Sequence, residues 1–389
     1  MPLRILHITP AYYPATYWGG PIYSLLRLSE GLAKLDSVVL RVLTTDSAGP
    51  SVGDRVTVSR IPMRTWTGYE VYYCRRVCGV AISPGLLVKM WPLIRWSDVV
   101  HLTGTYSFPT IPTLLVCRLL RKPVVWSPRG ALKATQEWPG ARKRLLKKLW
   151  EWICRLVIPR ESVLHVTSEE EKASSLARLP NMRAAVIPNG VDVPSTLLPR
   201  VWLPGGSLRI MYIGRLAKEK GIENLLEALG RYDDRHATLD IYGSGDPLYV
   251  AKLRNDVRGL GIESNVTFRG FVDGEEKEVA FSKADVCVVP SHSESFGIVI
   301  AEALAHGVPV IASKGTPWQG LDTSGCGFWV ENDPDSLAMT LTRVRRLSLQ
   351  ELGERGRTWM RQSYSWDRVA REMNAIYLDL TDSITSMNK

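Results

Sequence analysis

The sequence is poor in cysteine, with six thiols spread over 389 residues. No Cys-x-x-Cys pair occurs, so the spacing predicts neither a disulfide framework nor a cysteine-based metal site. The chain also lacks a run of 18 apolar residues, and we therefore predict no transmembrane helix. Its N-terminus has neither the basic start nor the long apolar stretch of a signal peptide. We expect a reduced, cytoplasmic protein.

What is present suits two soluble domains of similar size. The chain is 45% hydrophobic and 23% charged, and it is too long for one ordinary core. Residues 1–190 hold 26 Lys+Arg against 12 Asp+Glu, whereas the remainder holds 23 against 27. This asymmetry indicates that one half faces an anionic ligand or surface. A nucleic-acid partner is not expected, because no helix-turn-helix, zinc finger or base-stacking module appears.

Segments typical of strands and helices alternate along the chain in two series. A Pro/Gly-rich stretch at 194–206 separates them. The strands are expected at 4–9, 38–44, 99–102, 123–126 and 163–166, and then at 208–213, 238–242, 265–268, 286–289 and 308–311. This order predicts an α/β fold with two doubly wound domains. Their ligand is expected at a cleft between the carboxyl ends of the sheets.

The most specific motif follows the strand at 286–289, where a polar loop leads into an apolar helix expected at about 297–306. Backbone amides at a helix start have no intrahelical partner and lie at the positive end of the helix dipole. The backbone of Phe296, Gly297 and Ile298 is therefore predicted to bind a phosphate.

Two carboxylates flank this helix start. Glu294 lies in the loop before it, and Glu302 lies about five residues into the helix, roughly 8 Å along its axis. Alone, either one would be taken for a plain surface residue. At two distances from one phosphate site, the pair suits hydroxyl groups on two different sugars.

A second motif follows the strand at 208–213 and begins with Gly214. Arg215 and Lys220 place two cations in a turn at the carboxyl edge of the sheet. When a sugar–phosphate bond breaks, charge grows on the departing diphosphate, so fixed cations stabilise the transition state more than the ground state. Arg215 offers a fork to phosphate oxygens and Lys220 a point charge, whereas Lys218 is expected to be a spectator.

Together these motifs resemble those of the retaining GT-B glycosyltransferases of family 4. Weaker matches extend the resemblance over almost the whole chain, at 19–20, 168–171, 187–192, 243–245 and 365–366. The resemblance implies two Rossmann-like domains facing a central cleft. The acceptor would bind to residues 1–195 and the nucleotide sugar to residues 196–365. A C-terminal helix at 366–389 would cross back to the N-terminal domain.

The resemblance also implies roles for the charged residues. Arg215 and Lys220 would hold the donor diphosphate, Glu302 the ribose hydroxyls, and Glu294 the transferred sugar. Transfer would retain the anomeric configuration by front-face attack, with the leaving phosphate taking the acceptor's proton. No protein nucleophile, cofactor or metal is then expected. A glycan or polyprenyl-diphosphate-linked acceptor, used in bacterial surface-polysaccharide biosynthesis, is the expectation for such a family.

Glycines complete the predicted donor site. By resemblance, the Gly19-Gly20 loop would close on the phosphates from the N-terminal domain. Gly214 would begin the cationic turn. Gly243 follows a strand without the full Gly-x-Gly-x-x-Gly pattern, so it is not interpreted as a nicotinamide site and could instead line the nucleotide pocket.

Two positions depart from the family pattern. Many relatives carry a histidine where this chain has Thr103, which leaves His101 as a candidate for either a catalytic or a buried strand role. Many also carry a histidine where this chain has Arg129. That side chain is a candidate phosphate contact for donor or acceptor, or else a surface turn residue.

The segment at 141–160 interleaves seven Lys and Arg residues with leucines and tryptophans. Its spacing predicts an amphipathic helix. One interpretation is a surface helix packed on its own sheet, and the other is a helix lying on the inner face of an anionic membrane.

Two further alternatives concern chemistry. A nucleotide-sugar epimerase or a phosphorylase on the same architecture remains the alternative to transfer. Asp333 and Asp335 spell a D-x-D pattern, but Asp333 before Pro334 is better explained as a helix N-cap than as a metal ligand.

Overall fold

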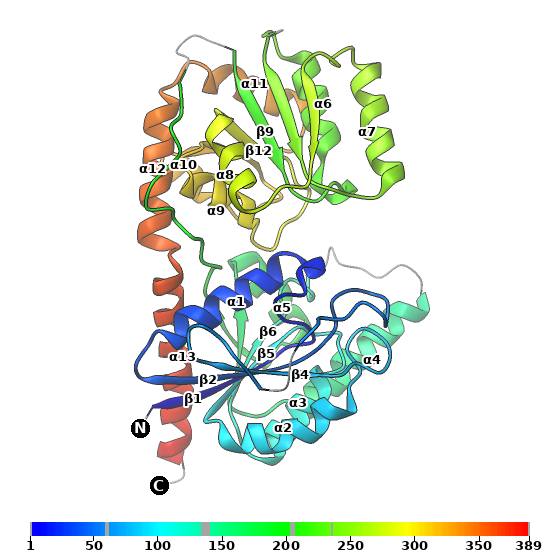
Figure 1. Cartoon of the computed structure of the whole chain (residues 1–389), viewed down its shortest axis with the longest axis vertical. Helices are drawn as coiled ribbons and strands as arrows, with labels where there is room; N and C mark the ends of the chain where they lie inside the picture. Colours follow the sequence, from blue (N-terminus) through cyan, green and yellow to red (C-terminus); the bar gives the residue numbers. More distant parts are fainter. Residues whose placement is uncertain (1, 59–61, 134–140, 203–206, 235, 388–389) are drawn as a thin grey trace. The chain divides into compact units, whose positions relative to one another are not determined.

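The computed structural model describes residues 2–58, 62–133, 141–202, 207–234 and 236–387. The chain forms two compact units (Figure 1). Unit 1 comprises Met1–Gly190 and Trp366–Lys389, and unit 2 comprises Val191–Ser365. Residues 203–206 of the expected linker and 388–389 of the expected terminal helix lie outside the described residues.

Each unit is built on a parallel sheet with helices on both faces, so the predicted α/β fold class is confirmed. Unit 1 holds the strand order β3-β4-β2-β1-β5-β6-β7-β8, in which only the short β3 is antiparallel to its neighbour. The strands are β1 (Leu3–Ile8), β2 (Val38–Thr45), β3 (Met63–Arg64), β4 (Glu70–Cys74), β5 (Val99–Thr103), β6 (Val124–Ser127), β7 (Ser162–Val166) and β8 (Arg183–Val186).

Alternate residues of these strands face two different helix layers. One core joins the sheet to α1 (Gly20–Ala33) and to the terminal helix α13 (Trp366–Met387). The other core joins it to α2 (Pro84–Trp96), α3 (Thr110–Leu119) and α4 (Ala141–Val157), which lie together in Figure 1. The remaining elements are η1 (Thr16–Trp18), before α1, and α5 (Glu169–Arg178), after β7.

Unit 2 repeats this plan with the order β11-β10-β9-β12-β13-β14, all parallel. The strands are β9 (Arg209–Ile213), β10 (Thr238–Tyr242), β11 (Val266–Gly270), β12 (Val286–Val289), β13 (Val310–Ser313) and β14 (Gly327–Val330). The helices are η2 (Lys218–Lys220), α6 (Ile222–Arg231), α7 (Pro247–Gly259), α8 (Gly274–Lys283), α9 (Ile298–Ala305), α10 (Gly320–Thr323), α11 (Pro334–Val344) and α12 (Leu349–Ser363).

Two helix caps follow from the sequence. The Asp333 carboxylate accepts the Ser336 N–H at 2.9 Å with Pro334 next in line, which confirms the predicted N-cap. The Ser168 hydroxyl accepts the Glu171 N–H at 3.2 Å, as the capping-box spacing predicts. Glu171 does not return to Ser168, however, and instead accepts from Thr167 N–H at 2.8 Å. Within the described residues, no helix is long and apolar enough to cross a bilayer.

Three histidines lie in a row inside unit 1. His7 on β1, His101 on β5 and His165 on β7 are fully or almost fully buried on the face that α13 covers. The ring centroids of His7 and His101 are 4.7 Å apart, and those of His101 and His165 are 5.8 Å apart. Burial is the largest cause that lowers the pKa of all three rings.

The hydrogen bonds of these rings fix their tautomers. His165 Nε2 lies 3.0 Å from the Ile187 carbonyl oxygen, which can only accept, so this nitrogen carries the proton. The neutral ring then accepts at Nδ1 from the Ser127 hydroxyl at 2.6 Å, and Ser127 accepts from His101 Nε2 at 2.7 Å. His101 Nδ1 in turn accepts from the Tyr377 hydroxyl of α13 at 2.5 Å. This histidine chain ties the terminal helix to the sheet through neutral rings.

The histidine chain makes the free energy of unfolding sensitive to acid. Burial lowers the pKa of His7 and His165 from 6.5 to about 3. Between these values the unfolded chain binds protons that the fold excludes, so stability is complete above pH 6.5 and is lost as the pH falls toward 3. The pKa of His101 is lowered as well. We predict that the free energy of unfolding of unit 1 in urea is about 6 kcal/mol lower at pH 5 than at pH 7.5, from about 1.4 kcal/mol per pH unit for each of the three histidines.

Two variants check the origin of this pH dependence. His165→Asn should reduce the slope of unfolding free energy against pH by about a third, because one of three excluded protons disappears. His236→Asn, at an exposed position of unit 2, should leave the slope unchanged. A parent protein equally stable at both pH values would contradict the neutral histidine chain.

Candidate active site

The strand order of unit 2 reverses between β9 and β12. The chain moves outward from β9 to β10 and β11, then returns to the other side of β9. Loops leaving adjacent strands at such a switch point run in opposite directions and open a crevice at the carboxyl edge. Both sequence motifs lie there, one after β9 and the other after β12.

The two loops touch backbone to backbone, and glycine makes this contact fit. Gly221 has φ +61°, and a Cβ added to it would lie 2.1 Å from the Pro290 carbonyl oxygen. A Cβ on Gly243, after β10, would lie 1.8 Å from the Gly214 carbonyl oxygen. No side chain fits at these distances, so Gly221 and Gly243 hold neighbouring strand ends together.

The contact brings Lys220 to Glu294. Lys220 Nζ lies 2.5 Å from Glu294 Oε1, and the Ser291 hydroxyl donates to the same oxygen at 2.9 Å. The side chains of Lys220 and Glu294 remain 19% and 15% exposed. Two of the residues predicted to act on the donor thus form one half-buried ion pair at the crevice.

The start of α9 lies in the same loop. Gly297 adopts φ +78°, and no described side chain caps the helix. Trp318 Nε1 donates to the Phe296 carbonyl oxygen at 2.5 Å, and this hydrogen bond stabilises the turn before α9. The Ile300 N–H donates to the Gly297 carbonyl oxygen at 2.9 Å, but no described side chain caps the earlier amides of Ile298 and Val299, as an anion site requires.

Glu302 is held by a lysine that the sequence analysis did not single out. Lys277 of α8 donates to Glu302 Oε1 at 2.6 Å. The other oxygen, Oε2, is buried and accepts no hydrogen bond from the described residues. A buried unpaired acceptor is costly in a folded protein, and a hydroxyl donor from a ligand would satisfy it.

Arg215 lies apart from this ion pair. Its guanidinium is 68% exposed and bonds Glu219 at 2.5 Å, while its carbonyl accepts from the Tyr212 hydroxyl at 2.9 Å. Burial, with a smaller contribution from the charge of Glu294, raises the pKa of Tyr212, so this hydroxyl stays a neutral donor. The structure thus brings Lys220, but not the Arg215 guanidinium, to Glu294.

The other predicted residues belong to unit 1. Gly19 precedes α1 with φ +68°, and open space surrounds both Gly19 and Gly20. His101 is fully buried, and both of its ring nitrogens have protein partners, so it takes the strand role. Arg129 is in a turn after β6 with φ +55°, and its Nη1 donates to Asn189 at 2.7 Å.

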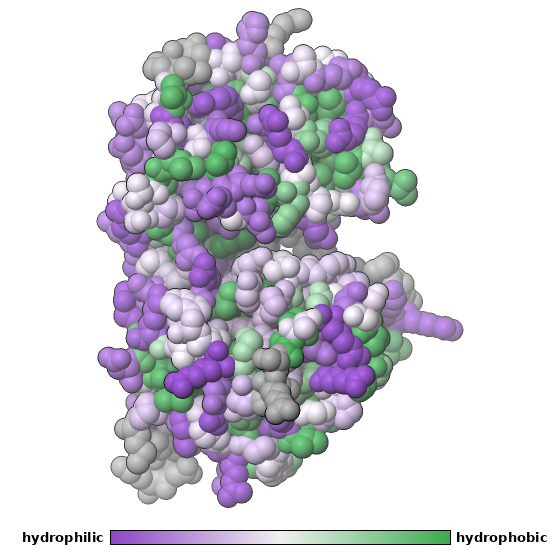
Figure 2. Space-filling model, in the orientation of Figure 1, coloured by the Kyte–Doolittle hydropathy of each residue, from purple (hydrophilic) through white to green (hydrophobic). Residues whose placement is uncertain are grey.

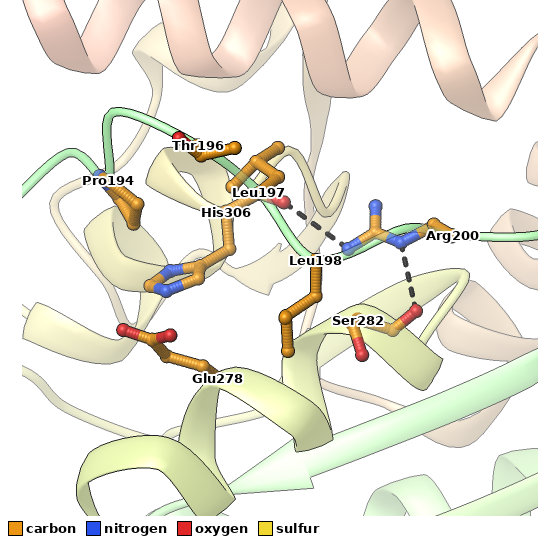
Figure 3. Close-up of a pocket in the computed structure, with 8 residues that line it drawn as sticks. All are labelled: Pro194, Thr196, Leu197, Leu198, Arg200, Glu278, Ser282 and His306. Atoms are coloured by element: carbon orange, nitrogen blue, oxygen red, sulfur yellow. Dashed lines mark hydrogen bonds between the residues drawn. The ribbon is translucent and has the colours of Figure 1, made fainter.

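A shallow pocket elsewhere in unit 2 is formed where a connecting segment is anchored to two helices. It lies where the segment after β8 meets α8 and α9 (Figure 3). Arg200 donates to the carbonyl oxygens of Phe281 and Gly307 at 2.7 Å each, and to Ser282 and His306 at longer distances. Its guanidinium is thus used to hold this segment to two helix ends. Among the described residues, no group of three or more His, Cys, Asp or Glu could hold a metal ion.

Comparison with known proteins agrees with this geometry. Residues 19–190 match the family described as "Glycosyl transferase 4-like domain", and residues 207–346 match "Glycosyl transferases group 1". The chain is therefore a member of the GT-B glycosyltransferases, with one such domain in each unit.

Individual proteins show the same likeness. An uncharacterized glycosyltransferase of Methanocaldococcus jannaschii is 33% identical over 54% of this chain, and the match spans only 57% of that relative's length. A D-inositol 3-phosphate glycosyltransferase of Xylanimonas cellulosilytica is 28% identical over 97% of this chain and 95% of its own. The structure of sucrose-phosphate synthase from Thermosynechococcus elongatus superposes with a TM-score of 0.72 at 21% identity, covering 98% of this chain and 100% of that one.

The backbone contact at Gly221 can be tested with a matched pair of glycines. Gly221 and Gly261 share φ values of +61° and +66°, but no atom lies within 4 Å of a Cβ added to Gly261. Gly261→Ala should lower the unfolding free energy of unit 2 by about 1 kcal/mol, from backbone strain alone. Gly221→Ala adds a clash with a carbonyl and should lower it by about 3 kcal/mol or more. Urea unfolding measures both, and equal losses would contradict the contact.

Proposed function

We propose that this chain is a retaining glycosyltransferase that moves a sugar from a nucleotide-sugar donor to an acceptor hydroxyl. One observation carries the proposal. The Lys220–Glu294 ion pair, the uncapped start of α9 and the unpaired oxygen of Glu302 lie around one switch point of unit 2. A cation and free amides suit a diphosphate, while the carboxylates suit the hydroxyl groups on either side of it.

In this proposal each group has one task. The α9 amides and Lys220 bind the diphosphate, and Glu302 Oε2 accepts from a ribose hydroxyl while Lys277 holds its other oxygen. Glu294 accepts from a hydroxyl of the sugar. Arg215, with its exposed guanidinium, would have to leave Glu219 to reach a phosphate.

The reaction is a substitution at the anomeric carbon. The bond from that carbon to the diphosphate oxygen breaks, and a bond to the acceptor oxygen forms on the same face. The acceptor proton passes to the departing phosphate, so no protein nucleophile or metal is invoked. Lys220 stabilises the negative charge that grows on the leaving group, which lowers the barrier because this interaction strengthens in the transition state.

The site variants should separate binding from turnover. Glu302→Gln keeps its shape but weakens its acceptor, so we expect the Kd of the bound nucleoside diphosphate to rise about tenfold, or roughly 1.4 kcal/mol. Lys220→Ala should lower kcat about 100-fold or more. Lys218→Ala, which removes an exposed neighbouring lysine, is the matched control and should change neither quantity. Unaltered transfer by both site variants would refute the proposal.

We further propose that the enzyme works at an anionic membrane surface, on a glycan or a polyprenyl-diphosphate-linked acceptor bound by unit 1. The support is the orientation of α4. Its face toward the rest of unit 1 carries the buried Lys147, Glu151 and Cys154 together with Trp150 and Val157, which pack on the core. Five other apolar side chains point outward and are between 49% and 69% exposed: Leu145, Leu146, Leu149, Trp152 and Leu156.

Basic residues surround this apolar row. Exposed cations on α4 are Arg142, Lys143, Arg144, Lys148 and Arg155. At the side of unit 1 where Figure 1 labels α4, hydrophobic and hydrophilic residues lie side by side in Figure 2. An apolar row flanked by cations matches a lipid surface, in which acyl chains lie beneath anionic headgroups. Surface-polysaccharide assembly on a lipid carrier is the pathway that such a placement favours.

Vesicle sedimentation tests the membrane surface. The parent should sediment with vesicles rich in phosphatidylglycerol and much less with pure phosphatidylcholine vesicles. Leu149→Ser with Trp152→Ser should reduce binding to the anionic vesicles at least fivefold, and reversing the charges of Arg142 to Lys148 should do the same. The control pair Leu248→Ser and Met339→Ser alters exposed apolar residues of unit 2 and should change nothing. Unchanged sedimentation of the α4 variants would reject the surface.

A further inference from the structure

Arg129 is a half-buried cation that makes no ion pair with the described residues. One guanidinium nitrogen donates to the amide oxygen of Asn189 at 2.7 Å, whereas Nε is buried and has no hydrogen-bond partner among the described residues. No carboxylate of these residues forms an ion pair with it. Burial accordingly lowers the pKa of Arg129. Its backbone also lies in the left-handed region at φ +55°, which is unusual for a residue with a side chain.

The neighbouring carboxylate, Glu171, already accepts hydrogen bonds at both of its oxygens. Glu171 Oε1 accepts from the Gly130 N–H at 2.5 Å, and Oε2 accepts from both the backbone and the hydroxyl of Thr167 at 2.8 and 2.7 Å. These bonds anchor the turn that carries Arg129. The charge of Glu171 favours the arginine cation from a distance, but this attraction is smaller than the effect of burial.

The histidine chain beneath supplies no negative charge either. The positive charge of Arg129 contributes to the low pKa of His7, His101 and His165, so the rings stay neutral. Arg129 thus lies next to neutral rings and keeps a buried Nε–H without an acceptor among the described residues. A buried polar group in a folded protein normally has a hydrogen-bond partner, so this position is an incomplete site that an anion could complete.

Other polar side chains without partners lie along the same edge of the sheet. Arg129 follows β6, whose neighbour β5 ends at Thr103. The hydroxyls of Thr103 and Thr105 and the indole N–H of Trp18, in the loop after β1, are buried without a hydrogen-bond partner among the described residues. All can donate, and they follow β1 and β5, the strands between which the order of unit 1 reverses.

We infer that the carboxyl edge of unit 1 binds a phosphate group of the acceptor through Arg129. The inference rests on the proposed function, which assigns the acceptor to unit 1. A phosphate offers more acceptor oxygens than a carboxylate does, which matches a cation with several unpaired donors nearby. Asn189 orients the guanidinium. Thr103 ends the neighbouring strand, paired with Ser127, and its hydroxyl can donate to the same group. The acceptor class is thus a phosphorylated or diphosphate-linked glycan rather than a neutral one.

Inorganic pyrophosphate is a direct probe of this edge. In full-length protein, Lys220→Ala first weakens the phosphate site of unit 2, and calorimetry at low salt then measures pyrophosphate binding. Adding Arg129→Gln to this background should weaken binding at least tenfold, and Arg129→Lys should weaken it less. Arg183→Gln, at an exposed arginine of unit 1, should have no effect. Binding within twofold of the background in the Arg129→Gln protein would overturn the inference.

Asn189→Asp separates a binding role from a structural one. This nearly isosteric change gives Arg129 the carboxylate that it lacks. We expect the melting temperature to rise and pyrophosphate binding to fall at least tenfold, because the internal ion pair competes with the ligand. A structural arginine would gain stability without any loss of pyrophosphate binding, which would overturn the inference.

Donor and acceptor phosphates are distinguished in protein that retains Lys220. UDP and GDP affinities should be the same for Arg129→Gln and for the parent. A tenfold loss of nucleotide affinity in that variant would assign Arg129 to the donor and overturn its assignment to the acceptor. Failure of the proposed function would appear differently, as a parent protein that binds no nucleotide and transfers no sugar, whatever residue stands at 129.

Discussion

The candidate site depends on the contact between the backbone at Gly221 and the carbonyl of Pro290. Parallel topology sends the loops after β9 and β12 away from each other, so sheet geometry alone would leave their side chains apart. Gly221 lets the first loop pass against the second, and Lys220 is the residue immediately before it. The Lys220–Glu294 pair therefore depends on the absence of a side chain at position 221. A charge pair placed by backbone packing is held more rigidly than one placed by long side chains on loops, and such rigidity favours preorganised electrostatic stabilisation.

The two units share one sheet topology but differ in the charges at the carboxyl edges of their sheets. At the switch point of unit 2, cations and carboxylates pair with each other, and a ligand must exchange those pairs for its own charges. At the corresponding edge of unit 1, Arg129 stands above neutral rings and the neighbouring donors have no acceptors. The first arrangement suits a ligand that carries both anionic and hydroxyl groups. The second suits an anion alone, which agrees with the excess of basic residues in the first 190 positions.

Sequence reasoning reached the strands and the motif loops because both carry local signals. The strands β10 and β12 have the predicted bounds, since short apolar runs bounded by turn residues are typical of buried parallel strands. Four strands were not predicted. The strand β3 has only two residues, and in β4, β8 and β14 the residues Glu70, Arg183 and a leading Gly327 obscure the apolar pattern, so that pairing with a neighbouring strand supports them. The N-cap at Asp333 was predictable from four consecutive residues.

The partners of the site residues could not be predicted in the same way. Lys277 and Glu302 are 25 positions apart in the sequence, and Trp318 and Phe296 are 22 apart. No sequence pattern indicates that residues at these spacings form hydrogen bonds. Arg215 was predicted beside Lys220 because both belong to one motif. In the structure the turn directs its guanidinium to Glu219 instead. A motif fixes which loop a residue belongs to, whereas the direction of a long side chain depends on neighbours that only the fold supplies.

The helix α4 is a second case in which the sequence predicted an element but not the neighbours of its side chains. Its pattern of leucine and cation predicted an amphipathic helix, and the usual assumption is that the apolar side faces the core. Here the core-facing side holds Trp150, Cys154 and Val157 but also two charged residues. The Lys147 ammonium lies over the Tyr106 ring, and Glu151 bonds Arg178 at 2.9 Å. Those polar contacts meet the cost of burying the charged side, so the leucines are left facing outward. A helix that buries charge and exposes leucine is stable only if its outer face later finds an apolar surface or tolerates water. An exposed apolar row beside five cations contributes little to the core of unit 1, and this is the observation from which the proposed membrane surface is argued.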